Sequence, residues 1–306
     1  MNIILYSTFI MILVGVIVGF ILGFAAEKFK VKSNPKKEKV LEVLPGANCG
    51  ACGYVGCEMY AENIVEKNVD ISLCKPGGNE VVEKIAEIIG KDVVEVQRKV
   101  AQVLCNGGDR CKDDFVYMGI KKCSYAQKNF SGQKKCKYAC LGFGDCVEIC
   151  PFNAMYINKY GVAEVDILKC TGCGLCVSVC PQKIIKLVGC EYKVHIKCSS
   201  KDKGSVVRQI CSVGCVGCGV CVKVCPVKDI QLENNLAIMK YDKCNNCKLC
   251  ITKCPTKCIE FGNFNKKDGL RKDFDQKNFN TVKGSTKSNP EKEVSGQINL
   301  NLNLVK

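Results

Sequence analysis

Cysteine is the residue type in this sequence whose spacing could support chemistry. The chain has 306 residues, of which 27 are cysteine. Dense cysteines indicate disulfides in small secreted proteins and metal ligation in proteins kept under reducing conditions. Most of these cysteines lie in short runs with two to four residues between neighbours, so that adjacent thiolates can face one centre. We therefore expect metal ligation.

Three runs share the spacing C-x2-C-x2-C-x3-C-P. In such runs the first three thiolates surround one 4Fe–4S cluster, and the fourth ligates the neighbouring cluster. Structural zinc sites instead pair two C-x2-C hooks across a longer gap. The spacing therefore predicts 4Fe–4S clusters at Cys170, Cys173, Cys176 and Cys180; at Cys215, Cys218, Cys221 and Cys225; and at Cys244, Cys247, Cys250 and Cys254.

An internal repeat surrounds these runs. Cysteines 136, 140, 146 and 150 recur as 211, 215, 221 and 225, and CTGCGLCVSVCP from Cys170 matches CNNCKLCITKCP from Cys244. A fixed displacement of this kind indicates a duplicated structural unit. The repeat predicts two tandem two-cluster ferredoxin-like units of βαβ type, with a short helix after each Cys-Pro.

Crossed ligation assigns four ligand sets to the two units. Phe143 stands where the second unit has Cys218, so we expect Cys136 to complete the first set from upstream. In the second unit Cys211 and Cys218 are both candidates, and Cys218 has the standard spacing. The expected sets are Cys136, Cys140, Cys146 with Cys180; Cys170, Cys173, Cys176 with Cys150; Cys215, Cys218, Cys221 with Cys254; and Cys244, Cys247, Cys250 with Cys225.

A fifth cysteine group lies nearer the N-terminus. It has the spacing C-x2-C-x4-C followed by a remote cysteine, in the order Cys49, Cys52, Cys57 and Cys74. Interleaved glycines leave room for backbone N–H groups to approach the sulfur atoms, which favours a fifth 4Fe–4S cluster. Zinc stays open as an alternative at this group.

Seven cysteines remain: Cys105, Cys111, Cys123, Cys190, Cys198, Cys211 and Cys258. Cys258 aligns with Ile184 in the repeat and is expected to be a small core residue. A sixth cluster on Cys105, Cys111, Cys123 and one further cysteine stays open. We expect His195 to be a strand residue. No nucleophile–base arrangement, phosphate loop or dinucleotide motif appears, so we expect no catalytic residue and no direct NAD binding.

The N-terminal segment predicts a membrane anchor. Residues 1–26 carry no charged side chain, and about 20 apolar residues span a bilayer as a helix. Six lysines follow between Lys28 and Lys39, whereas a cleaved signal peptide carries its positive charge first. The positive-inside rule then places the N-terminus outside and the cluster domains on the cytoplasmic side of the cell (inner) membrane.

These features predict an α+β architecture. Its expected parts are a transmembrane helix (1–26), a basic linker (27–40), a single-cluster 4Fe–4S domain (41–104), a connecting segment (105–133), ferredoxin-like unit 1 (134–187), a connecting segment (188–210), ferredoxin-like unit 2 (211–262) and a disordered tail (263–306). Helical periodicity is expected from about Glu80 to Leu104. The tail is too polar to fold alone, and its final INLNLNLV alternates as a strand does.

The charge balance alone suggests a polyanionic partner. Lys and Arg number 45 against 30 Asp and Glu, a formal charge of +15. Each cluster with four thiolates adds negative charge, which offsets part of this excess. No nucleic-acid motif accompanies the lysines, so we expect no nucleic acid as partner.

The order of motifs resembles a known family. LPGANCGACGYVGC, KYACLGFGDCVEICP, CTGCGLCVSVCP and HIKCSS occur in one order over residues 1–262, as in the B subunit of the Rnf complex, an ion-translocating ferredoxin:NAD oxidoreductase of bacterial membranes. The chain departs from the family pattern at Ala139, before Cys140.

The resemblance implies a role in electron transfer. The chain would accept electrons from reduced soluble ferredoxin and relay them through about five 4Fe–4S clusters to membrane subunits, with NAD reduced on another subunit and Na⁺ or H⁺ moved elsewhere. Lys134, Lys135, Lys223, Lys228 and Lys248 are expected either to dock an acidic ferredoxin or to be ordinary solvated surface. Two other functions stay open, an iron–sulfur donor subunit of another membrane reductase and a non-redox zinc scaffold.

Overall fold

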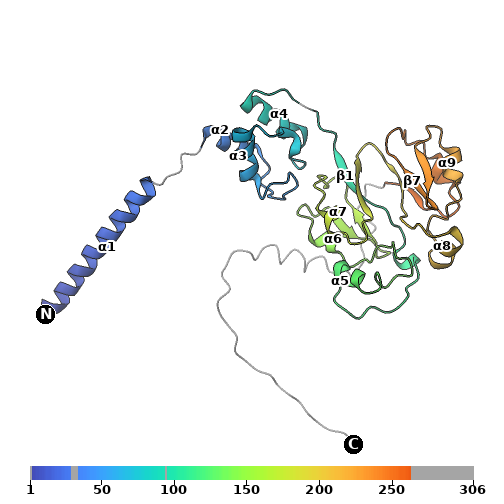
Figure 1. Ribbon diagram of the computed structural model, residues 1–306, viewed down its shortest axis with the longest axis horizontal. Coiled ribbons are helices and arrows are strands. Elements are labelled where there is room, and N and C mark those ends of the chain that lie inside the picture. Colours follow the sequence, from blue (N-terminus) through green and yellow to red (C-terminus); the bar gives the residue numbers. More distant parts are fainter. Residues whose placement is uncertain (1, 29–33, 94, 263–306) are drawn as a thin grey trace, which may run out of the picture. The chain divides into compact units, whose positions relative to one another are not determined.

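A computed structural model of the chain describes residues 2–28, 34–93 and 95–262 (Figure 1). The chain divides into two parts, an N-terminal part that ends at Arg98 and a C-terminal part that begins at Lys99. The polar tail expected to be disordered, with its strand-like end, lies outside the described residues.

The N-terminal part begins with a long apolar helix, α1 (Asn2–Lys28). Its stretch from Tyr6 to Ala25 is long and apolar enough to cross a membrane, by length and composition. Its large apolar side chains, such as Phe9 and Phe20, are exposed. The next helix, α2 (Pro35–Val43), starts inside the expected linker, where the Asn34 side chain accepts a hydrogen bond from the backbone N–H of Lys36.

Helix α2 packs with α3 (Cys57–Lys67), the 3₁₀ turn η1 (Ile71–Leu73) and α4 (Gly78–Ile89) around a small apolar core. The helix expected to extend to about Leu104 was predicted too long. It ends at Ile89 because Gly90 adopts a left-handed conformation with φ +78°, which an ordinary side chain disfavours. Residues Lys99–Val103 form strand β1 instead.

Within residues 99–262, the C-terminal part contains four two-stranded antiparallel sheets. They pair β1 with β4 (Ile185–Gly189), β2 (Met155–Ile157) with β3 (Ala163–Val165), β5 (Val194–Ile196) with β8 (Ile259–Phe261), and β6 (Ile230–Glu233) with β7 (Leu236–Met239). Strands β1–β4 build the first ferredoxin-like unit and β5–β8 the second, each around its own apolar core.

The outer strands β1 and β5 lie upstream of the cysteine repeat, before the boundaries expected at residues 134 and 211. Each ferredoxin-like unit therefore takes its outer strand from a segment that the repeat did not include. The sequence repeat covers the ligand loops but not these strands, because only the ligand loops retain a recognisable pattern of cysteines.

Short helices accompany the cysteine runs. Four of them, α6 (Asp145–Glu148), α7 (Leu175–Val179), α9 (Val220–Val224) and α10 (Leu249–Lys253), come directly before a Cys-Pro pair. The expectation of a helix after each Cys-Pro was therefore wrong. Proline disfavours the helical conformation at the residue before it, so each helix ends there and a turn leads into the next strand.

Three further short elements connect the units: η2 (Gly108–Arg110), α5 (Cys123–Lys128) and α8 (Gly204–Ile210). The segments near η2 and α8 pair with each other. Lys112 N–H donates to the Ile210 carbonyl at 2.8 Å, and Ser212 N–H donates to the Arg110 carbonyl at 3.1 Å. This pairing ties the first ferredoxin-like unit to the second.

Candidate iron–sulfur sites

The N-terminal part brings its four expected cysteines together. Cys49 and Cys52 lie in a loop that leads into α3, Cys57 is the first residue of that helix, and Cys74 follows η1. Burial, together with the nearby charges of Cys57, Cys49 and Cys52, raises the pKa of the Cys74 thiol to about 11. Gly50 and Gly53, with φ of +70° and +88°, fold the loop, and the Asn48 side chain accepts from the Cys57 N–H at 2.8 Å.

Three of the four expected sets in the ferredoxin-like units also come together, each lining one cavity. Cys150, Cys170, Cys173 and Cys176 line a cavity of about 310 Å³; Cys215, Cys218, Cys221 and Cys254 line one of about 320 Å³; and Cys225, Cys244, Cys247 and Cys250 line one of about 300 Å³. The fourth cysteine of each run reaches the neighbouring cavity, as crossed ligation requires.

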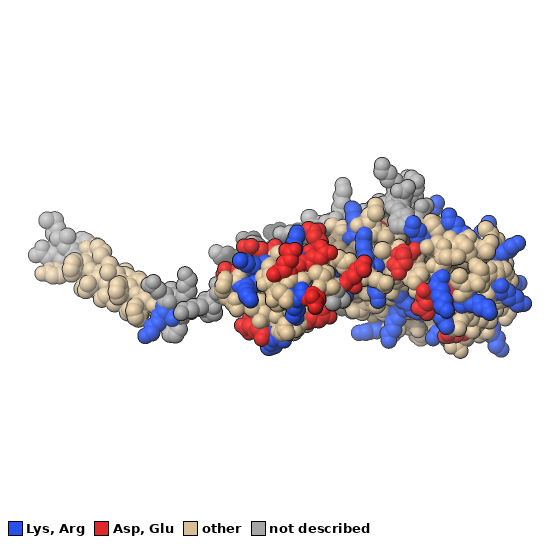
Figure 2. Space-filling model, turned by 90° about the horizontal axis from the view of Figure 1, so that it is seen from above, with Lys and Arg blue, Asp and Glu red and all other residues tan. Residues whose placement is uncertain are grey.

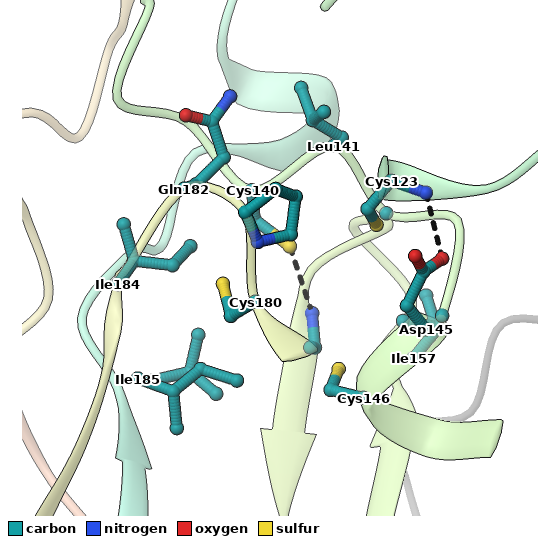
Figure 3. Close-up of a pocket in the computed structure, with 15 residues that line it drawn as sticks. Cys123, Cys140, Leu141, Asp145, Cys146, Ile157, Cys180, Gln182, Ile184 and Ile185 are labelled. Atoms are coloured by element: carbon teal, nitrogen blue, oxygen red, sulfur yellow. Dashed lines mark hydrogen bonds between the residues drawn. The ribbon is translucent and has the colours of Figure 1, made fainter. Parts of the chain in front are cut away.

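The remaining expected set does not form as predicted. A cavity of about 380 Å³ is lined by Cys140, Cys146 and Cys180 together with Cys123, and Cys136 lies elsewhere. Figure 3 shows the four sulfur atoms around a common space. Cys136 is held away because residues 134 and 113 form a β-bridge and the Lys135 N–H donates to the Lys112 carbonyl at 2.9 Å.

Asp145 explains why Cys123 takes this position. Its buried carboxylate accepts hydrogen bonds from the backbone N–H groups of Cys123 at 2.7 Å and Ser124 at 3.0 Å, at the start of α5 (Figure 3). The second ferredoxin-like unit has Val220 at the corresponding position and a local cysteine, Cys218, where the first has Phe143. The unmatched aspartate was the available sequence signal for a remote ligand.

A fifth cavity of about 370 Å³ lies between the two ferredoxin-like units. Five cysteines line it: Cys105, Cys111, Cys136, Cys198 and Cys211. Of the cysteines considered for a sixth cluster, Cys105 and Cys111 are here, whereas Cys123 is not. Cys211 lines this cavity and Cys218 lines the cavity of Cys215, so the two candidates face different sites.

Comparisons with known proteins agree with this geometry. A family described as a putative Fe-S cluster matches residues 44–76, and two described as 4Fe-4S dicluster domains match residues 135–184 and 169–229, and 208–255. The chain is 44% identical to the B subunit of a proton-translocating ferredoxin:NAD(+) oxidoreductase complex from Clostridium ljungdahlii, over 80% of this chain and 87% of that protein.

Other relatives are similar in extent. The B subunit of the Na(+)-translocating complex from Acetobacterium woodii is 41% identical over 80% of this chain and 74% of its own length. The B subunit of an ion-translocating oxidoreductase complex from Methanosarcina acetivorans is 38% identical over 75% and 88%. The chain belongs to this B-subunit family. It is an electron-transfer protein of an oxidoreductase complex, with 4Fe–4S cluster domains and an apolar helix that indicates membrane association.

The sites of this B-subunit family member fit iron–sulfur clusters. Burial raises the pKa of the Cys176 thiol to about 12 and those of Cys221 and Cys250 to about 11, so the thiols stay neutral unless cationic iron displaces their protons. Thr171, in the cavity of Cys170, has a buried hydroxyl without a protein partner. A donor of this kind suits a cavity filled by an acceptor that the protein does not supply.

Backbone N–H groups already point at the ligand sulfurs. Ala101 donates to Cys170 Sγ at 3.4 Å, Ala154 to Cys150 Sγ at 3.4 Å and Ala163 to Cys140 Sγ at 3.5 Å. Such bonds stabilise thiolate ligands and tune the potential of a cluster. In the described ranges no three His, Cys, Asp or Glu side chains converge closely enough for one metal ion.

The structure places two single residues, His195 and Cys258, where the sequence predicted them. His195 lies in β5, as predicted, with Nδ1 3.2 Å from the Tyr241 hydroxyl, and burial lowers its pKa to about 4, which keeps it neutral. Cys258 is buried as expected, and its Sγ lies 3.7 Å from Cys254 Sγ.

Proposed function

We propose that this chain takes electrons from a reduced ferredoxin at its second ferredoxin-like unit and relays them toward the membrane subunits of its complex. The observation that carries this proposal is the exposure of two cysteines, Cys218 and Cys247, which line the two cavities of that unit. Because electron transfer slows steeply with distance, a cluster whose ligand reaches the surface is the best acceptor for a soluble donor.

The charges of the C-terminal part suit an acidic partner. Residues 99–262 carry 25 Lys and Arg against 13 Asp and Glu, whereas residues 34–98 carry 8 against 11. Figure 2 shows Lys and Arg spread over the C-terminal part and Asp and Glu gathered on the N-terminal part. Electrostatic complementarity of this kind raises the rate of association.

The expected docking lysines divide by their surroundings. Lys134 is paired with Asp113 at 2.8 Å, and its side chain is only 7% exposed, so it is not part of the proposed surface. Lys135, Lys223, Lys228 and Lys248 are exposed. Lys223 follows Cys221 on α9, and Lys248 follows the exposed Cys247, so these two are close in sequence to the cysteines that we propose as the electron-accepting edge.

Within the chain, the protein's task is to hold and to space the clusters. A bound 4Fe–4S cluster accepts and releases one electron without a proton or a new bond. The cysteine sets fix each cluster, the N–H groups of Ala101, Ala154 and Ala163 stabilise the sulfur ligands, and the alternating short helices place two sites next to each other in each unit. This task requires no acid, base or nucleophile from the described residues.

The remaining parts of the proposal concern count, location and partners. One cluster in the N-terminal part and four in the ferredoxin-like units give about five, with Cys123 in place of Cys136. The lysines between Lys28 and Lys39 favour an outer N-terminus and cytoplasmic cluster domains. Because the relatives are named as subunits of ferredoxin:NAD(+) oxidoreductase complexes, the proposal places NAD reduction on another subunit of the complex.

Charge reversal at matched positions tests the docking surface. Lys243 precedes Cys244 in the second unit and corresponds to Lys169, which precedes Cys170 in the first; both lysines are exposed. We expect Lys243→Glu combined with Lys248→Glu to slow reduction by ferredoxin roughly tenfold at low salt, because the on-rate loses electrostatic steering. Stopped-flow bleaching of the visible cluster absorbance in the full-length, anaerobically prepared chain measures this rate.

Two controls make the result specific. Ferredoxin should reduce the clusters of the Lys169→Glu variant at the wild-type rate. Dithionite should reduce the clusters of all variants at the same rate. An equal slowing by Lys169→Glu and the double variant, or no dependence of the wild-type rate on ionic strength, would show that ferredoxin does not dock at the second unit.

A further inference from the structure

The cavity between the two ferredoxin-like units is built from two equivalent halves. In the first unit, Cys105 follows β1 and Cys136 stands four residues before Cys140. In the second, Cys198 follows β5 and Cys211 stands four residues before Cys215. The backbone repeats as well, since Leu104 N–H donates to the Ile184 carbonyl and Lys197 N–H to the Cys258 carbonyl, both at 2.8 Å.

The sulfur atoms of the two halves receive equivalent hydrogen bonds. Cys105 Sγ accepts from the N–H groups of Gly107 and Cys140, both at 3.4 Å. Cys198 Sγ accepts from the N–H of Cys215 at 3.3 Å and from that of Ser200. Paired N–H donors are the usual environment of a cluster thiolate. Cys105 and Cys198 therefore have the environment of ligands although neither belongs to a regular motif.

Each half also contributes a residue that lies close to a cysteine of the other half. A Cβ on Gly107 would lie 3.6 Å from Cys211 Sγ and 3.7 Å from Cys105 Sγ, so these two sulfurs converge on one point from different units. At the equivalent place in the second half, the Ser200 side chain hydrogen-bonds with Cys136. The four thiols thus surround one space at the joint between the units.

The fifth cysteine of the cavity, Cys111, lacks a counterpart. The spacing that leads from Cys105 to Cys198 leads from Cys111 to Gly204. Cys111 pairs with Cys211 through a β-bridge, and its thiol hydrogen-bonds with the side chains of Cys136 and Cys211 as well as lying 3.8 Å from the Lys112 carbonyl. Its position resembles that of Cys258, an extra thiol beside a complete set of four.

One buried cation, Lys197, lines the same cavity, and a second cation, Arg110, lies near Cys211 without lining it. Lys197 is 8% exposed and lines the cavity wall. The Arg110 guanidinium holds Asn106 and has a buried Nε without a protein partner. Burying positive charge is costly unless negative charge lies near it. Glu164 and Glu260 lie near Lys197 and supply part of that charge, and a cluster with four thiolates, which is a net anion, would add to it.

We infer that Cys105, Cys136, Cys198 and Cys211 hold a sixth 4Fe–4S cluster that joins the two ferredoxin-like units. Through Cys105 and Cys198, this site is one backbone hydrogen bond from Cys140 in the first unit and from Cys215 in the second. It turns two separate pairs of clusters into one continuous line of five. The role of this cluster rests on the proposed relay, but its existence does not.

Counting clusters in the intact protein tests the inference. The full-length chain, reconstituted anaerobically in detergent, is analysed by native mass spectrometry and by iron and sulfide assay. We expect a maximum of six clusters, or about 24 irons per chain at four per cluster. The variants Cys136→Ala and Cys198→Ala should each stop at five clusters and about 20 irons, with one fewer spin in the EPR spectrum after reduction by dithionite.

Matched variants decide the ligand set. Cys111→Ala should still reach six clusters, as should Cys190→Ala, which removes a thiol outside all the described cavities. A wild-type maximum of five would overturn the inference even if a variant failed to fold. Loss of a cluster in Cys111→Ala but not in Cys198→Ala would overturn the assignment of Cys198. Because ferredoxin takes no part in these measurements, a failure of the docking proposal would leave them unchanged.

Discussion

The two ferredoxin-like units follow the same chain path twice but differ in how they shield their cysteines. Each has two cysteine-lined cavities, two short helices before Cys-Pro and an outer antiparallel pair of strands. In the first unit none of the lining cysteines is exposed, whereas in the second Cys218 and Cys247 are. The copies therefore conserve the ligand geometry while their contact with solvent has diverged.

Two local substitutions account for much of this difference. Where the second unit has Cys218, the first has Phe143, which packs against Tyr117 with ring centroids 5.4 Å apart and leaves the fourth position to Cys123. Gly172 in the first unit lies against the Lys99 carbonyl of β1, too close for any Cβ. The second unit has Asn246 there, whose side chain bonds the backbone of Lys193 and Glu191, each at 2.8 Å.

Within the proposed relay, this comparison indicates different electron-transfer roles for the two ferredoxin-like units. An exposed cluster edge can exchange electrons with a diffusing partner, whereas an enclosed one exchanges them only with fixed neighbours. Enclosure also changes the dielectric around a cluster and therefore its potential. The second copy suits reception from solution, and the first suits conduction within the complex.

The largest expected effect concerns the remote ligand. We expect Cys123→Ala to lose one cluster, about four irons, from the first unit because alanine offers no ligand. Adding Phe143→Cys to this variant should restore the cluster, since it recreates the local spacing of the second unit. Native mass spectrometry counts the clusters. If Cys123→Ala kept its full complement, the remote ligand would be excluded and the copies would not differ in this way.

The next effect concerns the carboxylate that positions Cys123. Asp145→Ala leaves two partly buried N–H groups, those of Cys123 and Ser124, without an acceptor, which costs about 1–3 kcal/mol per group at most. We expect the first unit to release iron to a chelator several-fold faster, with Asp145→Asn affected less because it retains an acceptor oxygen. Val220→Ala, at the matched position of the second unit, serves as the control. If Asp145→Ala and Val220→Ala released iron equally fast, Asp145 would have no special role in holding the cluster.

Solvent exposure should also order the loss of clusters in the wild-type chain. Under a limiting amount of oxygen or a chelator, the clusters of the second unit should decay before those of the first, because Cys218 and Cys247 give the reagent access. Time-resolved native mass spectrometry followed by alkylation and peptide mapping identifies the thiols released first. Early labelling of Cys140 or Cys146 would reverse the proposed contrast.

The smallest expected effect comes from the asparagine of the second unit. Asn246→Ala removes two side-chain hydrogen bonds to backbone and should lower the stability by about 1–2 kcal/mol. Thermal unfolding of the anaerobic holoprotein reports the change. Substituting the neighbouring exposed Asn245 with alanine should leave the midpoint of thermal unfolding equal to that of the wild type within experimental error. A stability unchanged in Asn246→Ala would mean that these bonds do not hold the loop of Cys247.

The local spacing of the cysteines was enough to predict how most of them group in the structure. Three of the four crossed sets expected from the regular runs each line one cavity, because cysteines two or three residues apart are positioned by one loop, and their ligation of iron stays a prediction. The set with Cys136 was predicted wrongly, since the choice of Cys123 depends on Asp145, which contacts it from more than twenty residues away. Comparing Asp145 with Val220 would have flagged that difference.

The fold showed the same limit. Apolar periodicity located α4 but extended it past Gly90, a glycine that the sequence already offered as a helix stop, and into β1, whose partner strand β4 an isolated segment does not reveal. The cysteine repeat did not predict the outer strands β1 and β5, for a related reason. Their residues serve only to pair with a distant strand, and many sequences meet that requirement.

The cavity between the ferredoxin-like units has a consequence for biosynthesis. Its walls come from both copies, with Cys105 and Cys136 translated well before Cys198 and Cys211. A cluster there cannot be inserted until the second copy has emerged from the ribosome and docked on the first. Metal loading at this joint would therefore be a late step of maturation, and a chain truncated before Cys198 would carry a surface that the metal-loading machinery could not complete.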